Sequence, residues 1–209
     1  MLLVFNCLSL HKKLRLTTMN RQSDYINFDS ALRKGNELLK NEKTSILGFY
    51  IIFSVNAGLR VSDVLKLKHS DLCNKKENDI LIVSEKKTNK IRNITINSHI
   101  EKAYNHLVEG LKKRNLFDET DFIFVSQKSS VYTNSSLNKL LKSVFNSTRL
   151  NISTHSLRKS FGRRVYENNM QSDHSLVLLS EIFCHSSIST TRKYLGLRRE
   201  EIGNVYLSL

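Results

Sequence analysis

The stretch that decides the fold reads DILIVSEKKTNKIRNITIN, residues 79–97. Apolar residues alternate with polar ones in each arm of this stretch, and we take Ile80 and Ile82 in the first arm and Ile94 and Ile96 in the second as the apolar positions. Alternation of this kind on both sides of a polar turn predicts a β-hairpin. The turn is rich in lysine, so the hairpin is expected to have a basic tip.

The segments on either side of the hairpin have helical patterns. A first helix is predicted after an N-cap at Asn27 or Asp29, and a second from about Thr44 to the turn Asn56-Ala57-Gly58. Further helices are predicted near 99–114, near 134–146 and over most of the chain from Ser153 onward, with a short apolar run at 122–125. The fold class is therefore α+β, mostly α, with one small antiparallel sheet.

Charge points to a polyanionic partner. The 209 residues have a formal net charge of +14, which favours nucleic acid, although a merely solvated basic face would give the same total. No apolar stretch is long enough to cross a bilayer. The cysteines Cys7, Cys73 and Cys184 have no metal-ligand spacing, which is typical of a reducing, cytoplasmic setting.

The chain is predicted to form one domain. Residues 1–20 precede the first helix signal and are interpreted as an N-terminal extension, whose apolar start lacks the order of a secretory signal. Met19 is an alternative start residue. Residues 21–209 have neither an internal repeat nor a low-complexity linker, and they are expected to fold as a single unit.

Four segments carry polar or ionisable residues where helical packing alone would not require them. They are Ala57-Gly58-Leu59-Arg60-Val61-Ser62-Asp63, Lys86-Lys87-Thr88, Thr154-His155-Ser156-Leu157-Arg158, and Cys184-His185 followed by Tyr194. The spacing of His155 and Arg158 puts both on one helical face, where a single anion could contact them. An N-cap at Ser153 or Thr154 would place these donors at the positive end of the helix dipole.

Each segment also has an ordinary interpretation when taken alone. Arg60 could be a surface residue paired with Asp63. His155 could be a structural residue at a helix start, and Tyr194 could be a half-buried packing residue. The individual segments therefore do not assign a function.

Taken together and in this order, the four segments resemble the signature of the tyrosine recombinase, or phage integrase, family. That signature has an Arg in a G-L-R-x-S-[DE] box, a Lys at a hairpin tip, an H-x-L-R box, and a late His followed nine residues later by Tyr. The matching residues are Arg60, Lys87, His155, Arg158, His185 and Tyr194, and the resemblance spans about residues 28–205. Two positions depart from the pattern: Cys184 replaces a frequent Gly, and Lys159 replaces a frequent His.

The resemblance implies a DNA breaking-rejoining fold, mostly helical with a small three-stranded antiparallel sheet. It also implies a site-specific DNA recombinase that needs neither metal nor ATP. Tyr194 would attack a scissile phosphodiester and leave a 3′-phosphotyrosine link and a free 5′-hydroxyl. Arg60 and Arg158 would clamp the non-bridging oxygens, because guanidinium forks match phosphate oxygens.

The remaining roles concern protons and DNA contacts. Lys87 would protonate the departing 5′-oxygen, with Lys86 and Lys90 as rivals for that role. His155 would assist proton transfer at the tyrosine, and His185 would donate a hydrogen bond to the phosphate. Contacts with DNA are further expected from Lys86, Lys90, Arg92, Lys159 and Arg192.

The implied partner is double-stranded DNA, bound in the cytoplasm at the nucleoid. Two sites would be held by a homotetramer whose C-terminal helices are exchanged between protomers, because an apolar stripe, Ile202, Val205, Tyr206 and Leu207, follows Tyr194. The alternative is that this stripe packs on its own domain.

Two other functions stay open: a monomeric type IB topoisomerase and a catalytically silent DNA-binding regulator. A separate core-binding domain, which family members usually carry before the catalytic domain, is not recognised in the sequence. The chain is therefore expected to be a minimal recombinase or a piece of a longer one.

Overall fold

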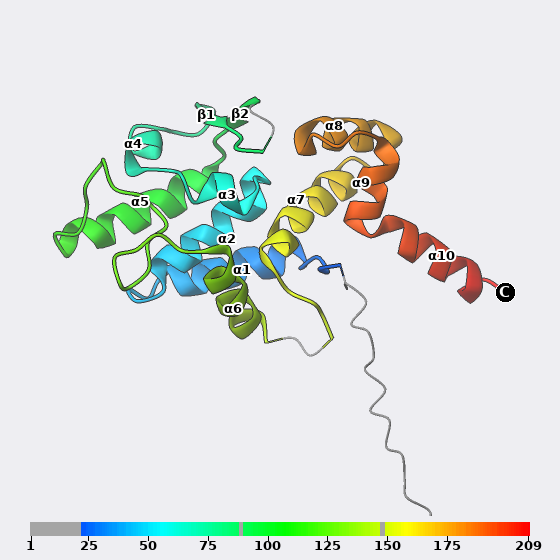
Figure 1. The fold of residues 1–209 in the computed structure, drawn as a ribbon, viewed down its shortest axis with the longest axis horizontal. Coiled ribbons are helices and arrows are strands. Elements are labelled where there is room, and N and C mark those ends of the chain that lie inside the picture. Colours follow the sequence, from blue (N-terminus) through cyan, green and yellow to red (C-terminus); the bar gives the residue numbers. More distant parts are fainter. Residues whose placement is uncertain (1–21, 88–89, 147–148) are drawn as a thin grey trace, which may run out of the picture.

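The computed structural model describes residues 22–87, 90–146 and 149–209, and helices dominate it (Figure 1). The helices are α1 Phe28–Leu39, α2 Ser45–Ala57, α3 Val61–Val64, α4 His69–Leu72, α5 Ser98–Lys113, α6 Asn134–Phe145, α7 Thr154–Asn168, α8 Asp173–Phe183, α9 Ile188–Leu195 and α10 Leu197–Leu207. The strands are β1 Ile80–Ser84 and β2 Ile91–Thr95. The predicted extension, residues 1–20, lies outside the described residues, as do Cys7, Met19 and Thr88.

Side-chain caps set several helix boundaries. The Asn27 side chain accepts a hydrogen bond from Ser30 N at 3.0 Å and begins α1, so the alternative N-cap, Asp29, falls inside the helix. Ser153 accepts one from His155 N at 3.2 Å and begins α7. Gly58 ends α2 in the left-handed conformation. These three boundaries confirm the predicted ones.

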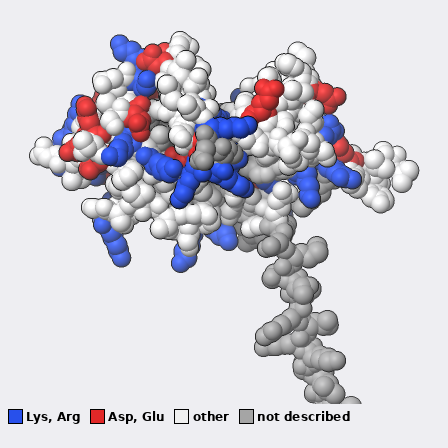
Figure 2. Space-filling model, turned by 45° about the horizontal axis from the view of Figure 1, so that its top comes forward, with Lys and Arg blue, Asp and Glu red and all other residues white. Residues whose placement is uncertain are grey.

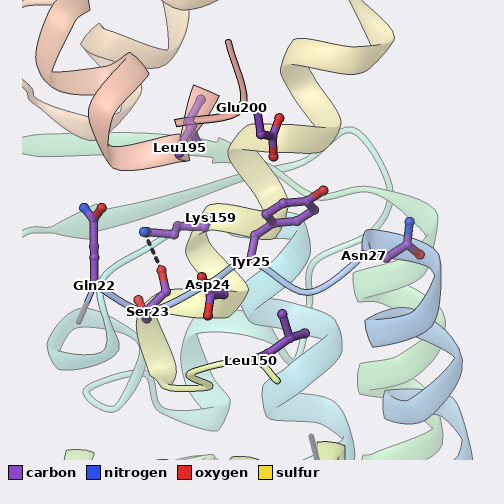
Figure 3. Close-up of a pocket in the computed structure, with 10 residues that line it drawn as sticks. Gln22, Ser23, Asp24, Tyr25, Asn27, Leu150, Lys159, Leu195 and Glu200 are labelled. Atoms are coloured by element: carbon purple, nitrogen blue, oxygen red, sulfur yellow. Dashed lines mark hydrogen bonds between the residues drawn. The ribbon is translucent and has the colours of Figure 1, made fainter. Parts of the chain in front are cut away.

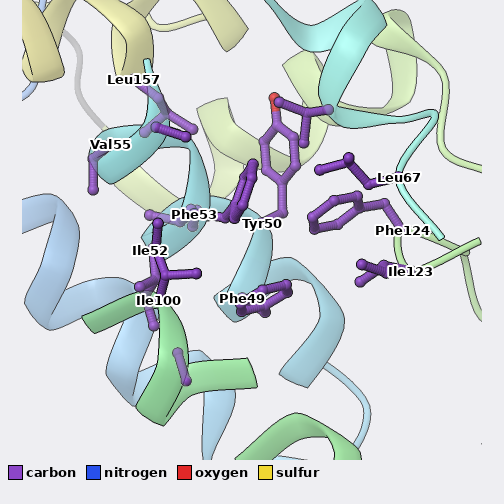
Figure 4. Packing of buried hydrophobic residues seen from close by; sticks show 14 of the residues in the cluster. Phe49, Tyr50, Ile52, Phe53, Val55, Leu67, Ile100, Ile123, Phe124 and Leu157 are labelled. Atoms are coloured by element: carbon purple, nitrogen blue, oxygen red, sulfur yellow. The ribbon is translucent and has the colours of Figure 1, made fainter. Parts of the chain in front are cut away.

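The main core surrounds α2. This helix is apolar on all sides and is buried almost throughout, packed against α1, α5 and α7, as expected for a helix without a polar face. Its aromatic side chains meet Phe124, whose ring stacks on Phe49 at 5.7 Å and meets Tyr50 edge-on at 5.6 Å (Figure 4). Leu157 brings the start of α7 into the same cluster.

A second, smaller cluster joins α7 to the C-terminal helices. Its buried residues are Tyr166, Leu176, Leu179, Phe183, Leu195 and Leu197. Gly162 permits the close approach of α7, because an added Cβ would lie 2.6 Å from the Leu195 side chain and 2.9 Å from the Phe183 ring. In Figure 1 these helices lie beside the main body, with α7 between the two parts.

The hairpin is confirmed as an antiparallel pair in which Leu81 lies opposite Ile94. Leu81 and Ile94 face the core, whereas Ile80 and Ile82 are 48% and 67% exposed. The buried positions of the first arm are therefore Leu81 and Val83, not the Ile80 and Ile82 on which the predicted alternation was based. The first arm is apolar at every position from Ile80 to Val83, so alternation alone did not fix which face is buried.

A third strand is absent from the sheet within the described residues. The remaining extended run, 122–125, forms only single bridges, from Phe122 to Lys68 and from Val125 to Val131. Those partners lie outside the hairpin, so the predicted three-stranded sheet is corrected to a two-stranded one. No helix in the described part of the chain is long and apolar enough to cross a membrane.

Candidate active site

Two arginines from distant segments meet at one carbonyl group. Arg60 lies between α2 and α3, and Arg158 lies in the second turn of α7. Each donates a hydrogen bond from Nη2 to the carbonyl oxygen of Phe183, at 3.2 Å in both cases. Both guanidinium groups are therefore held at the end of α8, within reach of one anion.

Gly58 organises the arginines from the other side. Its φ of +57° suits glycine, and an added Cβ would lie 2.4 Å from the Phe161 ring. Its carbonyl accepts hydrogen bonds from Arg158 Nη1 at 2.8 Å and from Arg92 Nη1 at 3.3 Å. The turn that ends α2 is therefore a support for two cationic side chains.

Glu85 is a buried acid that sequence reasoning did not single out. It is 1% exposed, and its carboxylate pairs with Arg60 at 2.5 Å and with Arg92 at 3.7 Å. One signal was present in the sequence: Glu85 continues the every-second-residue series of the inward-facing Leu81 and Val83. Its charge and its place directly before the lysines of the turn favoured an exposed position instead.

The hairpin tip carries exposed lysines. Lys86, Lys87 and Lys90 are all exposed, and the backbone N–H of Lys86 donates to Asp63 Oδ1 at 3.0 Å. Asp63 is buried and Arg60 pairs with Glu85, so the surface pair of Arg60 with Asp63 does not form. The tip thus presents its ammonium groups beside the arginine cluster.

His155 lies in the first turn of α7, beside these cations. Surrounding protein, followed by the positive charges of Arg158, Lys159, Arg60 and Lys87, lowers the pKa of its imidazole. The ring is therefore neutral at pH 7 and can accept a proton.

His185 and Tyr194 pack against each other, with ring centroids 5.2 Å apart. His185 Nδ1 lies 3.0 Å from the Thr191 hydroxyl, and burial lowers the pKa of the imidazole. The Tyr194 hydroxyl is buried without a hydrogen-bond partner among the described residues. Burial raises the pKa of Tyr194 to about 12, and the charges of Arg158 and Arg60 oppose that rise.

Hydrogen bonds, ring contacts and mutual electrostatic effects thus link five predicted positions, Arg60, Arg158, His155, His185 and Tyr194. The model of the Phage integrase family matches residues 33–201, most of the chain. The chain belongs to the phage integrase family. Members named integrases or recombinases are accordingly among its relatives.

One such relative is the probable integrase/recombinase YoeC of Bacillus subtilis, 30% identical over 160 residues, which cover 76% of this chain and 81% of YoeC. Another is the tyrosine recombinase XerH of Helicobacter pylori, 29% identical over 185 residues, or 86% of this chain and 46% of XerH. The chain thus spans about half the length of some family members that it matches.

Solved structures show the same fold. A XerH recombinase in a post-cleavage complex with a palindromic difH substrate has a TM-score of 0.65 and 26% identity, over 90% of this chain and 54% of that one. XerA recombinase has a TM-score of 0.64 and 21% identity, over 90% and 65%. The mostly helical fold with a small sheet is therefore the fold of this integrase family.

The five residues expected to contact DNA lie in different surroundings. Lys86 and Lys90 are exposed, but Arg92 donates to the carbonyls of Ala57 and Gly58. Lys159 is 3% exposed, which argues against the predicted contact with DNA. Arg192 pairs with two acidic side chains, Asp173 at 3.4 Å and Glu201 at 2.5 Å.

A cleft of about 650 Å³ separates β2 from the end of α8. Lys90, Arg92, Cys184 and His185 are among the residues that line it. Lys and Arg side chains gather across the middle of the face in Figure 2, and acidic side chains lie toward either side. No group of His, Cys, Asp and Glu in the described part of the chain could hold a metal ion.

Proposed function

We propose that this member of the phage integrase family is a site-specific DNA recombinase with Tyr194 as its nucleophile. The observation that carries the proposal is the convergence of Arg60 and Arg158 on the Phe183 carbonyl, in the helix-loop-helix segment that also carries Tyr194. Two guanidinium groups so placed suit the non-bridging oxygens of a phosphodiester, whose negative charge grows in the transition state.

Cleavage exchanges one phosphoester bond for another. The Tyr194 oxygen attacks phosphorus, the bond from phosphorus to the 5′-oxygen breaks, and the DNA 3′-phosphate remains on the tyrosine. The phenol proton passes to His155, whose lowered pKa keeps the ring neutral and able to accept it. Lys87 donates a proton to the departing 5′-oxygen, and attack by a 5′-hydroxyl reverses the sequence. No metal or ATP takes part.

His185 acts as a hydrogen-bond donor to the phosphate. Its pKa is lowered by burial, so the ring is neutral and carries one N–H. With Nδ1 accepting the proton of the Thr191 hydroxyl 3.0 Å away, that N–H is on Nε2. The Thr191 contact therefore leaves the donor side of the ring to the substrate.

The buried hydroxyl of Tyr194 has to be uncovered before attack. We assign this step to a shift of α9 and α10 during assembly on DNA. The apolar stripe of α10 is exposed, with Tyr206 at 74% and Leu207 at 86%, so it does not pack on its own domain. We propose that the stripe docks on a second copy of this chain, within a tetramer that holds two DNA sites.

DNA would approach the hairpin tip, where Lys86, Lys87 and Lys90 are exposed. The net charge of +14 assists this approach and makes affinity fall steeply as salt rises. Arg192 would join only after leaving its acidic partners. Residues 21–209 would act as the catalytic domain, in the cytoplasm at the nucleoid, where the free thiols of Cys73 and Cys184 stay reduced.

A trapping experiment tests the proposed nucleophile. A pool of nicked duplexes of random sequence loses a short fragment after cleavage, so the covalent adduct accumulates and its DNA can be sequenced. The parent protein should form adduct with or without EDTA, and Y194F should form none. Y206F is the matched control, because it removes only the hydroxyl of an exposed tyrosine of α10 and keeps the ring that the proposed docking would use, so it should retain adduct formation.

Three outcomes would contradict the proposal. Adduct from Y194F but not from Y206F would move the nucleophile to Tyr206. Abolition of the adduct by EDTA would refute a metal-free reaction. Relaxation of plasmids without paired sites by a strictly monomeric protein would instead favour a type IB topoisomerase.

A further inference from the structure

Lys159 is a buried cation that the proposed reaction does not use. It is 3% exposed, and its Nζ lies 5.1 Å from the ring centroid of Tyr194. The same Nζ donates a hydrogen bond to the Ser23 carbonyl oxygen at 2.6 Å (Figure 3). A buried ammonium over an aromatic face is a cation–π contact, which desolvation strengthens.

The acceptor of this lysine is held in place by the segment that leads into α1. Ile26 N donates to Ser160 Oγ at 3.1 Å, and that hydroxyl donates to the Ile26 carbonyl. Asp24 N donates to the Asn151 carbonyl at 3.0 Å. The Ser23 carbonyl is therefore held in a fixed position relative to α7, and it holds the Lys159 ammonium in turn.

A cavity of about 310 Å³ lies beside this contact. Lys159, Ser23 and Leu195 are among its lining residues, and Leu195 directly follows the nucleophile in α9. In Figure 3 the Lys159 side chain runs across the cavity between α7 and the lead-in segment, toward Ser23. Lys159 thus connects the lead-in segment to the nucleophile.

The charges around Tyr194 are nearly all positive. Arg158 and Lys159 face it from α7, Arg60 from the turn before α3, and the neutral His185 from the loop after α8. Glu200 of α10 is engaged elsewhere, with Arg163 at 2.8 Å. Burial makes a phenolate costly here, and cations offset that cost. Of these cations, Lys159 lies over the face of the Tyr194 ring.

We propose that Lys159 is a positioning residue for the nucleophile, which fixes the Tyr194 ring and stabilises its phenolate form through the ammonium held by Ser23. The role in catalysis rests on the proposed function, but the effect on the tyrosine does not. It also gives a physical meaning to the lysine that stands where His is frequent in this family.

Two substitutions separate the charge of Lys159 from its hydrogen bond. K159Q keeps an N–H donor for the Ser23 carbonyl but has no charge, whereas K159R keeps the charge. K113Q is the matched control, since Lys113 is an exposed lysine at the end of α5, far from α9 in Figure 1. Thermal melting of all three proteins reports any loss of folding.

The first measurement needs no DNA. The protein is labelled with 3-fluorotyrosine, and Y194F assigns the ¹⁹F signal of position 194 among the seven tyrosines. The titration midpoint of that signal should rise by about one pH unit in K159Q and stay near the parent value in K159R and K113Q. An unchanged midpoint in K159Q, at unchanged melting temperature, overturns the proposal.

The second measurement follows adduct formation on a nicked duplex against pH. K159Q should react about tenfold more slowly than the parent near pH 7, as its smaller phenolate fraction requires, and recover as pH rises. A bridging sulfur in place of the 5′-oxygen leaves without protonation. It should rescue K87A but not K159Q, because Lys159 acts on the attacking side.

If adduct formation is slowed equally in K159Q and K159R at every pH, the positioning role is overturned. Such a result would show that the site requires the size and shape of lysine and not its charge. If K159Q cannot be obtained folded, the proposal is refuted when the ¹⁹F titration midpoint of Tyr194 in K159R lies far from that of the parent. If the ¹⁹F midpoint rises in K159Q but the parent protein forms no adduct, the proposed recombinase function is refuted while the electrostatic contact is upheld.

Discussion

The two hydrophobic clusters support different parts of the proposed reaction. The large cluster surrounds α2 and positions Arg60 and the start of α7, whereas the small cluster of α7 to α10 supports Tyr194. The two meet at Phe183, whose carbonyl accepts from both arginines and whose ring lies 4.5 Å from the Arg158 guanidinium. The proposed phosphate clamp therefore has the larger hydrophobic base, and the proposed nucleophile has the smaller one.

This division suits a nucleophile that starts buried. A clamp for developing charge is most effective when it needs no reorganisation, which favours the large cluster. The proposed reaction requires the Tyr194 hydroxyl to move, and elements that move are drawn from the less stable parts of a structure. The following predictions test the contrast between the clusters.

Phe49→Ala should produce the largest effect, because it removes a ring at the centre of the large cluster. Phe49 is fully buried against Phe53, Tyr104 and Phe124. The loss should be about 3–5 kcal/mol in the free energy of unfolding, measured by urea denaturation. L116A, at an exposed site, should change it by less than about 0.5 kcal/mol. Similar values for the two variants would refute a core centred on α2.

Arg158→Lys should weaken the contact between the clusters. The two Nη groups of Arg158 donate separate hydrogen bonds to the Gly58 and Phe183 carbonyls. Lysine lacks this planar pair of donors, so it can neither replace both hydrogen bonds nor bind two phosphate oxygens in the same geometry. Adduct formation on a nicked duplex should slow about 100-fold. R33K, on the exposed face of α1, is the control and should react at the parent rate. A rate for R158K within threefold of the parent would remove Arg158 from the clamp.

Leu179→Ala should separate the two clusters. Leu179 is fully buried in the small one, so truncation should cost about 2–3 kcal/mol. We expect the loss to be local: amide hydrogen exchange should accelerate in α8 and α9 while α2 stays protected. V177A, at a partly exposed site of the same helix, is the control. Equal acceleration in α2 would mean that the chain unfolds as one unit.

Much of this arrangement could be predicted from sequence, because local rules decided it. Capping residues such as Asn27 and Ser153 act within one helical turn, and the αL glycine Gly58 ends α2 where the apolar pattern stops. The order of the four segments indicated Arg60, His155, Arg158, His185 and Tyr194 as candidates, and the structure places them in contact or in mutual electrostatic influence.

What could not be predicted depends on contacts across the chain. Arg92 and Lys159 appeared as surface cations, yet carbonyls of Gly58 and Ser23 hold them inside. Their acceptors lie 34 and 136 residues away in sequence, so no local pattern indicated the burial. The buried carboxylate of Glu85 is a different case, because strand alternation pointed inward and only its charge argued otherwise.

The smallest predicted effect concerns pH and the large cluster alone. His69 is 3% exposed and packs on Tyr104, with its Nδ1 3.1 Å from the Tyr104 hydroxyl oxygen. The Tyr104 hydroxyl donates to the His69 carbonyl, so Nδ1 carries a proton and donates to the hydroxyl oxygen. Burial lowers the pKa of His69, against a weaker upward effect of Asp121 and Asp118.

Because the folded pKa of His69 lies below the unfolded value of about 6.5, the unfolded chain binds the proton first as pH falls. The contribution of His69 to the free energy of unfolding is therefore fully present above about pH 6.5 and is lost as pH falls below it. H69Q should flatten this part of the curve, measured as urea stability against pH, and H106Q, on the exposed side of α5, should keep it. If the parent and H69Q decline in parallel, the acid sensitivity belongs to His155 and His185, whose pKa values burial also lowers, and the large cluster is not its source.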